Sequence, residues 1–287
     1  MKQESYTPED ISIQLRNKKH ELAGCLGRDW YDNHPFKTAW FNAMSITFPL
    51  GEKSFIDSVR HYADKITDPK LQSEIKHFCG QEGIHRREHE LYNITLCKER
   101  GYDLNYLEGR IARKIKESDT KLSSIQRLSV TVALEHITAV LAERMLGDQV
   151  DANGVIEGPM KELWTWHAAE EMEHKAVAFD VYRSVTKNRP NSEKMRKSSL
   201  KLATFFLILD IAVGMVYMLR KDKKLWNIKV WVEGIQFLLG KQGYIRSSWP
   251  AYKEYFKEDF HPWQRDTRSL LENWEASQLN SEQMSTA

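Results

Sequence analysis

Two copies of the motif Glu-x-x-His are the part of this sequence best suited to chemistry. They are Glu82 with His85, and Glu171 with His174. Residues three positions apart share one face of a helix, so each motif directs a carboxylate and an imidazole toward the same point. Two such helices, with one Glu from each of two further helices, make the ligand set of a two-metal site in a four-helix bundle. The motifs therefore predict a dinuclear metal centre.

Two single carboxylates stand in the order along the chain that such a bundle needs. Glu52 precedes the first motif, and Glu135 lies between the two motifs. Glu143, two turns after Glu135 on a similar face, is the alternative on that helix. One Glu-x-x-His motif arises easily by chance in a Glu-rich helix, whereas two copies with single Glu residues interleaved favour a functional set. The predicted carboxylate ligands are thus Glu52, Glu82, Glu135 and Glu171.

Further histidines lie one turn from the motifs. His89 follows His85 by four positions, and His167 precedes Glu171 by four. Each is either a metal ligand or a hydrogen-bond partner that orients a ligand, since ligating groups commonly need such support. Four carboxylates and two or three imidazoles form a mixed oxygen and nitrogen shell, which suits iron or manganese and also admits zinc. We therefore expect two iron ions, with manganese or zinc as alternatives.

Three neighbours of the predicted ligands are not expected to bind metal themselves. His136 follows Glu135 directly, and one residue step turns a helix by about 100°. We therefore expect His136 to pack or to hydrogen-bond beside the site. Glu170 and Glu173 flank the second motif, and we expect them to contact the ligands or to lie near the helix surface.

Long helices must position these residues, and the hydrophobic pattern predicts where they lie. Almost nothing before residue 190 alternates with the period of two that a half-buried strand shows. The predicted fold is therefore all-α, a four-helix bundle with additional helices after residue 195. A polar link joins the second and third helices, and turn-rich residues 147–158 join the third and fourth. The helices are expected over residues 36–48 with a continuation to 62, 69–100, 122–146 and 159–187.

Pro49 is expected to interrupt the first of these helices. Proline disfavours the helical conformation of the residue that precedes it, which here is Phe48. Apolar residues at helical spacing then resume, so Glu52 is expected in the first turn of a new helical segment. The second helix is expected to end at Gly101, which supplies a C-cap.

Length and composition are those of an ordinary globular protein. The chain has 287 residues, of which 41% are hydrophobic and 29% charged, and its net charge of +2 gives no global attraction to nucleic acid. The first residues lack the apolar segment of a signal peptide, and the three cysteines show no metal-type spacing. We therefore expect a cytoplasmic protein with reduced thiols. The expected parts are an N-terminal extension over 1–35, the bundle over 36–190, and C-terminal helices over 191–287 packed on the same domain.

Residues 202–219 form an apolar segment that one charge, Asp210, interrupts, and Lys and Arg residues flank it on both sides. Its length is at the short end for crossing a bilayer, and a central Asp costs roughly 2.5–3.5 kcal/mol on insertion. A helix that is apolar all round also fits a buried core or a dimer contact. We expect a buried helix or a homodimer interface, and we leave membrane association through 202–219 open.

Several segments together resemble the ferritin-like di-iron carboxylate proteins. More narrowly, the chain resembles the bacterial family labelled "predicted metal-dependent hydrolase". The resemblance covers residues 36 to 274. It implies a ferritin-like four-helix bundle with a dinuclear site. The matching segments are Phe48 to Glu52, Gln81 to His85, Ala133 to His136, Trp166 to Lys175, and Phe260 to Trp263.

The position of His167 resembles an additional histidine in the ligand set of di-iron N-oxygenases. That resemblance implies seven protein ligands: Glu52, Glu82, His85, Glu135, His167, Glu171 and His174. The function expected first is a di-iron oxidase or oxygenase that uses O₂ and an electron donor on a small or lipid-like organic substrate. The alternative is a metal-dependent hydrolase in which two ions activate water. The ligands name neither the substrate nor the physiological metal.

Overall fold

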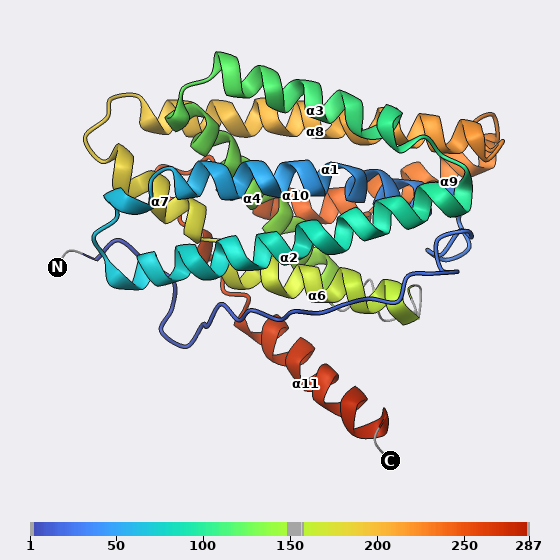
Figure 1. The fold of residues 1–287 in the computed structure, drawn as a ribbon, viewed down its shortest axis with the longest axis horizontal. Helices are drawn as coiled ribbons and strands as arrows, with labels where there is room; N and C mark the ends of the chain where they lie inside the picture. The colour runs from blue at the N-terminus through green and yellow to red at the C-terminus, as the bar shows by residue number, and fades with distance from the viewer. Residues whose placement is uncertain (1–2, 148–155, 157, 286–287) are drawn as a thin grey trace.

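The computed structural model describes residues 3–147, 156 and 158–285, with side chains described up to residue 280. Every regular element in these ranges is a helix, so the prediction of an all-α protein is confirmed. Most of the turn-rich connection predicted at 147–158 lies outside the described residues. Four long helices contain the predicted metal ligands (Figure 1). They are α1 (Pro35–Arg60), α2 (Pro69–Arg100), α4 (Ser124–Leu146) and α6 (Gly158–His174).

Local capping fixes where these helices begin and end. The side chain of His34 accepts a hydrogen bond from the backbone of α1, and that of Asp68 does so for α2, with proline following each cap. Ser123 and Gln126 form a capping box at the start of α4. Gly101 ends α2 with φ of 65°, a left-handed conformation that glycine adopts without strain, as predicted.

Helix α1 continues through Pro49, so the predicted interruption is wrong. A proline inside a helix leaves the carbonyl four residues earlier without its usual donor. Here that carbonyl belongs to Ser45, and the Asn93 side-chain amide of α2 donates to it at 3.1 Å. The neighbouring helix thus replaces the lost hydrogen bond. As a result, Glu52 lies inside a continuous helix instead of in the first turn of a new one.

Two further predictions about helix boundaries are wrong. The polar link after Gly101 contains a helix, α3 (Leu104–Lys121), which Asp103 caps. The fourth predicted helix is divided, because α6 ends at His174 and α7 (Val177–Thr186) begins three residues later. Neither glycine nor proline stands at this break, so no local sequence signal marks it.

The described C-terminal part of the chain adds four α-helices. Two short 3₁₀ helices lie in connections, one between α1 and α2 and one between α10 and α11. Helix α8 packs against α1 and α4, and α11 extends away from the other helices (Figure 1). Ahead of α1, the N-terminal segment runs along α2 and α6. The division of the chain at residues 35 and 190 stays a prediction. The elements are α8 (Ser192–Lys221), α9 (Ile228–Leu239), α10 (Tyr244–Glu254), α11 (Arg268–Ser285), η1 (Ala63–Lys65) and η2 (Pro262–Gln264).

Two hydrophobic clusters form the core, and the predicted ligands lie where they meet. On α1, Ile46 belongs to the first cluster and Phe55 to the second, with Glu52 between them. On α2 the order reverses, from Phe78 in the second cluster to Tyr92 in the first. Along α4 the side chains also pass from the second cluster to the first, as in α2. Helix α6 packs in the first cluster and α7 in the second, which is the order found along α1. Helices α1 and α6 therefore run in one direction and α2 and α4 in the other, with α3 crossing back between α2 and α4.

Candidate metal centre

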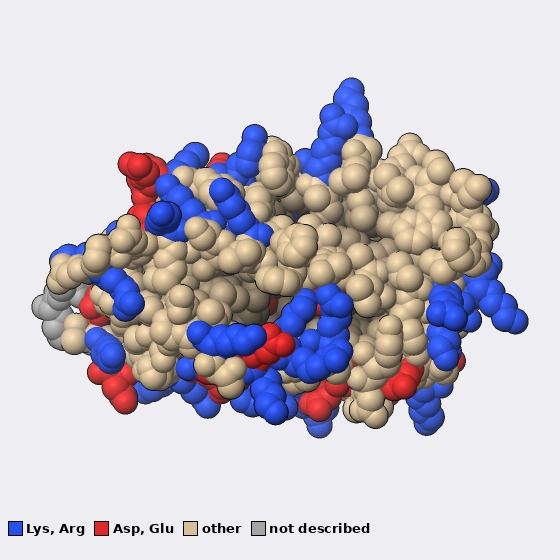
Figure 2. Space-filling model, turned by 90° about the horizontal axis from the view of Figure 1, so that it is seen from above, with Lys and Arg blue, Asp and Glu red and all other residues tan. Residues whose placement is uncertain are grey.

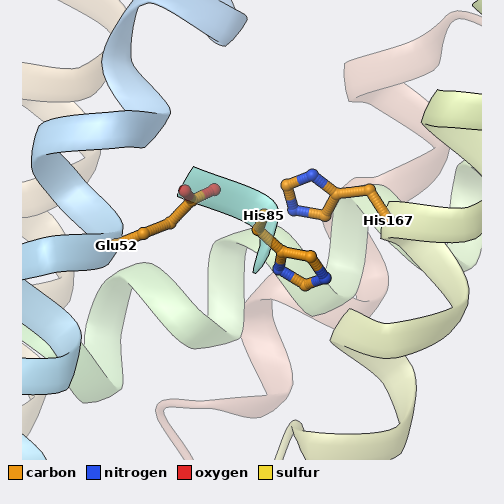
Figure 3. Close-up of side chains that lie close together, drawn as sticks. All are labelled: Glu52, His85 and His167. Carbon is orange, nitrogen blue, oxygen red and sulfur yellow. The ribbon is translucent and has the colours of Figure 1, made fainter. Parts of the chain in front are cut away.

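Three groups of side chains in the described residues have ligand atoms within 4.8 Å of one another, and all three are buried. Together these groups contain the seven predicted ligands and no other residue. Figure 3 shows the first group, in which the Glu52 carboxylate from α1 and the His85 and His167 rings from α2 and α6 lie close together. The groups are Glu52 with His85 and His167; Glu82 with His85 and Glu171; and Glu82 with Glu135 and His174.

The carboxylates of this cluster are buried and have few hydrogen-bond partners. Neither carboxylate oxygen of Glu52, Glu82 or Glu135 has a hydrogen-bond partner. The Oε2 atom of Glu171 also has none. The Nδ1 atom of His85 and the Nε2 atom of His174 are also without one. Ionised carboxylates are stable inside a protein only when they are paired or bind cations. The donor set therefore fits divalent metal ions.

Glu171 connects the groups within the cluster. Its Oε1 lies 3.0 Å from His167 Nε2 and 3.6 Å from His85 Nδ1, while its Oε2 lies 3.6 Å from His174 Nε2. The Nε2 atom of His174 also lies 3.2 Å from Glu82 Oε1 and 3.5 Å from Glu135 Oε2. The two oxygens of Glu171 thus face different histidines.

Hydrogen bonds on the outer side orient the histidines toward the cluster. His85 Nε2 lies 3.0 Å from Glu170 Oε2, so its Nδ1 faces the cluster. His174 Nδ1 lies 2.8 Å from Gln81 Oε1, so its Nε2 faces inward. Support of this kind fixes the tautomer and orientation of a ligating ring. Glu170 contacts a predicted ligand, as expected from the sequence.

His89 supports His167 instead of facing the cluster. His89 Nε2 lies 2.7 Å from His167 Nδ1, and His89 Nδ1 lies 2.9 Å from Ser45 Oγ. Both nitrogens of His89 are therefore in use, whereas His167 keeps its Nε2 for the cluster. This arrangement favours His167 over His89 as the additional donor.

Arg16 also contributes to the surroundings of the cluster, and sequence analysis did not identify it. It comes from the N-terminal segment, and its Nη2 lies 2.6 Å from Glu173 Oε1 while its Nη1 lies 3.4 Å from Glu170 Oε1. Glu173 also accepts from Gln81 at 2.8 Å. One arginine thus compensates two buried acids that adjoin the predicted ligands. Glu170 and Glu173 are both buried, so the alternative that they lie near the surface is wrong.

Aromatic side chains enclose the imidazoles. Phe48 packs on His167 with ring centroids 5.0 Å apart, Trp166 on His85 at 5.0 Å, and Phe78 on His174 at 4.9 Å. These rings occupy positions where water would otherwise reach the histidines. They also lower the local dielectric, which strengthens electrostatic interactions within the cluster.

Two residues considered from the sequence lie outside the cluster. Glu143 accepts hydrogen bonds from Arg265 at 2.5 and 2.6 Å. It is therefore not the carboxylate that α4 contributes. His136 packs against Tyr255 and Phe260, and its Nε2 lies 3.2 Å from a backbone carbonyl, so the packing role expected for it is confirmed.

Protons compensate part of the negative charge when no cation is bound. Burial and the charges of Glu82 and Glu171 raise the pKa of Glu52 and of Glu135 well above the usual range. Burial opposes the ionised form of Glu171, but the charge of His174 and the His167 hydrogen bond hold its pKa well below the usual range. In the metal-free chain these shifts favour the protonated forms of Glu52 and Glu135.

Metal binding is consequently expected to release protons and to strengthen as pH rises. Glu52 and Glu135 must lose their protons to bind a cation, and each released proton makes the affinity rise about tenfold per pH unit. Calorimetric titration with Mn(II) in two buffers of different ionisation enthalpy would measure the number released. We expect at least one proton per chain at pH 7. An affinity that stays constant between pH 6 and 8 would contradict the protonated state.

Two cavities lie near these helices but are separate from the cluster. The larger, about 470 Å³, lies between α1, α3 and α8, and the smaller, about 30 Å³, lies beside His136 and Lys175. None of the seven predicted ligands lines either cavity. The seven predicted ligands are at most 5% exposed, so the cluster itself is buried.

Comparison with known proteins identifies the family. Residues 14–266 match the model of a family described as predicted metal-dependent hydrolases. No curated protein and no solved structure matches the chain. The description favours the hydrolase alternative over the oxygenase expected first from the sequence, and it leaves the metal unnamed. Because the match covers most of the chain and includes every predicted ligand, the protein belongs to the family of predicted metal-dependent hydrolases.

Proposed function

We propose that the cluster holds two metal ions in a ferritin-like four-helix bundle. The directions of α1, α2, α4 and α6 and the crossover through α3 support this fold. Each Glu-x-x-His motif comes from one helix, and each single Glu comes from another, which is the ligand arrangement of such bundles. The observation on which the proposal rests is the set of buried oxygen and nitrogen atoms without hydrogen-bond partners.

Our first candidate function is hydrolysis by a dinuclear centre, which the family description supports. When bound, two ions would polarise an ester or phosphate and lower the pKa of a water molecule. The protein's own part is to hold the donors in place. Glu170 and Gln81 orient the His85 and His174 rings, His89 orients His167, and the aromatic rings keep other water away.

The second candidate is oxidation of an organic substrate by O₂ at a di-iron centre. The specific observation in its favour is the donor set, in which four carboxylates outnumber three imidazoles and all are at most 5% exposed. Oxygen-rich donors suit iron, and exclusion of water protects reactive species. O₂ is also small enough to reach a closed site. This reaction requires an electron donor, which the hydrolase does not.

One experiment distinguishes the two candidates. Metal-free protein is loaded anaerobically with Zn(II), Mn(II) or Fe(II), and the metal content is measured by mass spectrometry. Each form is then assayed without O₂ on p-nitrophenyl esters and phosphates, and the Fe(II) form is also exposed to O₂ while absorbance and O₂ uptake are followed. Turnover without O₂ supports hydrolysis. Uptake of O₂ by protein with two irons, without hydrolysis, supports oxidation instead, and failure to bind two ions per chain contradicts both.

A further inference from the structure

Helix α8 is half core and half exposed apolar surface. It is the one helix in the described residues long and apolar enough to cross a membrane, by length and composition alone. Its inner side chains, such as Met218 and Leu219, are fully buried against the core. On its outer side, Leu202, Phe205 and Ile208 are 59%, 61% and 52% exposed. The prediction of a buried helix is therefore wrong for this outer side.

Helix α9 and the link before it carry further exposed apolar side chains. Ile228, Val232, Ile235 and Leu239 lie along one side of α9 and are each about half exposed or more. Trp226, between the two helices, is 90% exposed. At the right-hand end, where α8 passes into α9, Figure 2 shows a broad area without charged side chains. We call the exposed apolar side chains of α8 and α9, with Trp226, the apolar face. Exposed patches of this kind are uncommon on monomeric soluble proteins and mark interaction sites.

Positive charge borders the apolar face at both ends of α8. Figure 2 shows Lys and Arg side chains around the uncharged area. The acids of this stretch are paired: Glu193 with Arg196, Asp210 with Arg110 and Lys114, Asp222 with Arg100, and Glu233 with Lys229. The remaining basic residues therefore leave a positive surplus. They are Lys194, Lys197 and Lys201 before the apolar segment, and Arg220, Lys221, Lys223 and Lys224 after it.

The packing of α8 excludes a transmembrane position in this fold. A spanning helix must be surrounded by lipid or by other spanning helices, whereas α8 packs against α1 and α4. Asp210 is held by ion pairs to α3, on the side toward the rest of the protein. A helix with one apolar side and flanking basic residues instead suits a position in the plane of the lipid headgroups. An exposed tryptophan such as Trp226 is typical of that interface.

We propose that the apolar face binds the surface of an anionic lipid bilayer in this in-plane orientation. Charge complementarity favours lipid over a second copy of the chain. Both ends of α8 are basic, so a symmetric dimer through this face would place basic ends opposite one another in either relative direction of the helices. Anionic headgroups compensate the same charges. This proposal is independent of the metal centre and of the reaction.

Cosedimentation of the full-length protein with vesicles tests the proposal. We expect at least tenfold stronger binding to phosphatidylcholine vesicles that contain 30% phosphatidylserine than to phosphatidylcholine alone. Binding to the anionic vesicles should fall severalfold in 0.5 M salt, because salt screens the electrostatic part. Absence of binding to the anionic vesicles, or a stable dimer in sedimentation velocity that does not bind them, would overturn it.

Paired variants locate the binding surface. The double variant Phe205→Ser/Trp226→Ser removes apolar anchors, and Lys223→Glu/Lys224→Glu reverses the basic border. Each is expected to weaken vesicle binding at least tenfold. Matched changes on other elements, Leu15→Ser/Leu279→Ser and Lys65→Glu/Lys76→Glu, alter exposed residues that belong to neither α8 nor α9 and should leave binding within twofold. Equal losses in these control variants would overturn the assignment, and thermal unfolding confirms that every variant is folded.

Discussion

Replacing Glu135 by Gln is expected to reduce the metal content from two ions per chain to one or none. Glu135 shares a group with Glu82 and His174, and both of its oxygens are buried without a partner. A glutamine offers one oxygen and an amide group that cannot bind a cation. Metal analysis of the purified variant after loading and desalting measures the change.

The metal-free fold should tolerate this substitution. Burial and the charges of Glu82 and Glu171 raise the pKa of Glu135, which favours the protonated, neutral form of the carboxyl. Glutamine has nearly the same shape and charge as that protonated form. We therefore expect the unfolding temperature of the metal-free variant to lie within a few degrees of the original.

Metal-dependent stability should fall sharply in the same variant. A ligand at a thousandfold excess over its dissociation constant stabilises the folded chain by about 4 kcal/mol per site. For a chain of this size each kcal/mol shifts the unfolding temperature by roughly 2–4 °C. Loss of one ion should therefore remove roughly 8–16 °C of the stabilisation by metal. Differential scanning fluorimetry with and without Mn(II) measures it.

Glu143→Gln is the matched control on the same helix. Glu143 bonds to Arg265 in a half-exposed ion pair, whose loss costs under about 1 kcal/mol. This variant should keep two ions per chain, and metal should raise its unfolding temperature as much as that of the original protein. If Glu135→Gln keeps two ions, or Glu143→Gln loses one, the ligand assignment on α4 is wrong.

The four side chains of the two Glu-x-x-His motifs could be predicted from the sequence because their positions depend on local periodicity, whereas His167 was chosen through the resemblance to di-iron N-oxygenases. Glu82 with His85, and Glu171 with His174, are three residues apart on strongly helical segments, so their shared faces follow from helix geometry alone. The end of α2 could be predicted for a similar reason, since it depends on a single residue, Gly101. Glu171 and His174 still share a helix face, because both lie within α6, which ends directly after His174. No local signal in the sequence marks that end.

What the sequence could not provide depends on contacts between distant segments. Helix α1 continues through Pro49 because Asn93, 44 positions later, donates to the free carbonyl of Ser45. His89 and His167 were equivalent candidates by spacing, and only the Ser45 hydroxyl and the mutual hydrogen bond distinguish their roles. Such pairings arise from packing of helices, which periodicity does not encode.

The second large effect is expected from Arg16→Met. Arg16 is the N-terminal partner of Glu170 and Glu173, which are 0% and 3% exposed. Removal of one member of a buried ion pair leaves the other charge without compensation, which costs about 3 kcal/mol or more. The unfolding temperature should therefore fall by roughly 6–12 °C. Arg28→Met, an exposed arginine of the same N-terminal segment, is the control and should have little effect.

Arg16→Met should also weaken metal binding, although Arg16 is not one of the seven predicted ligands. Burial raises the pKa of Glu170 to about 7, against the lowering effect of Arg16. Without the arginine this pKa rises further, so Glu170 becomes protonated at neutral pH and no longer orients His85 as a carboxylate. Loss of such support typically costs 10–100-fold in metal affinity.

The pH dependence separates this orienting role from a purely structural one. In the Arg16→Met variant, Glu170 regains its charge as pH rises, so metal affinity should recover more steeply between pH 7 and 9 than in the original protein. Arg16→Lys keeps one positive charge near the two acids and should restore part of both stability and affinity. A variant that loses stability but binds metal with unchanged affinity and pH dependence would show that the N-terminal segment stabilises the fold without orienting His85.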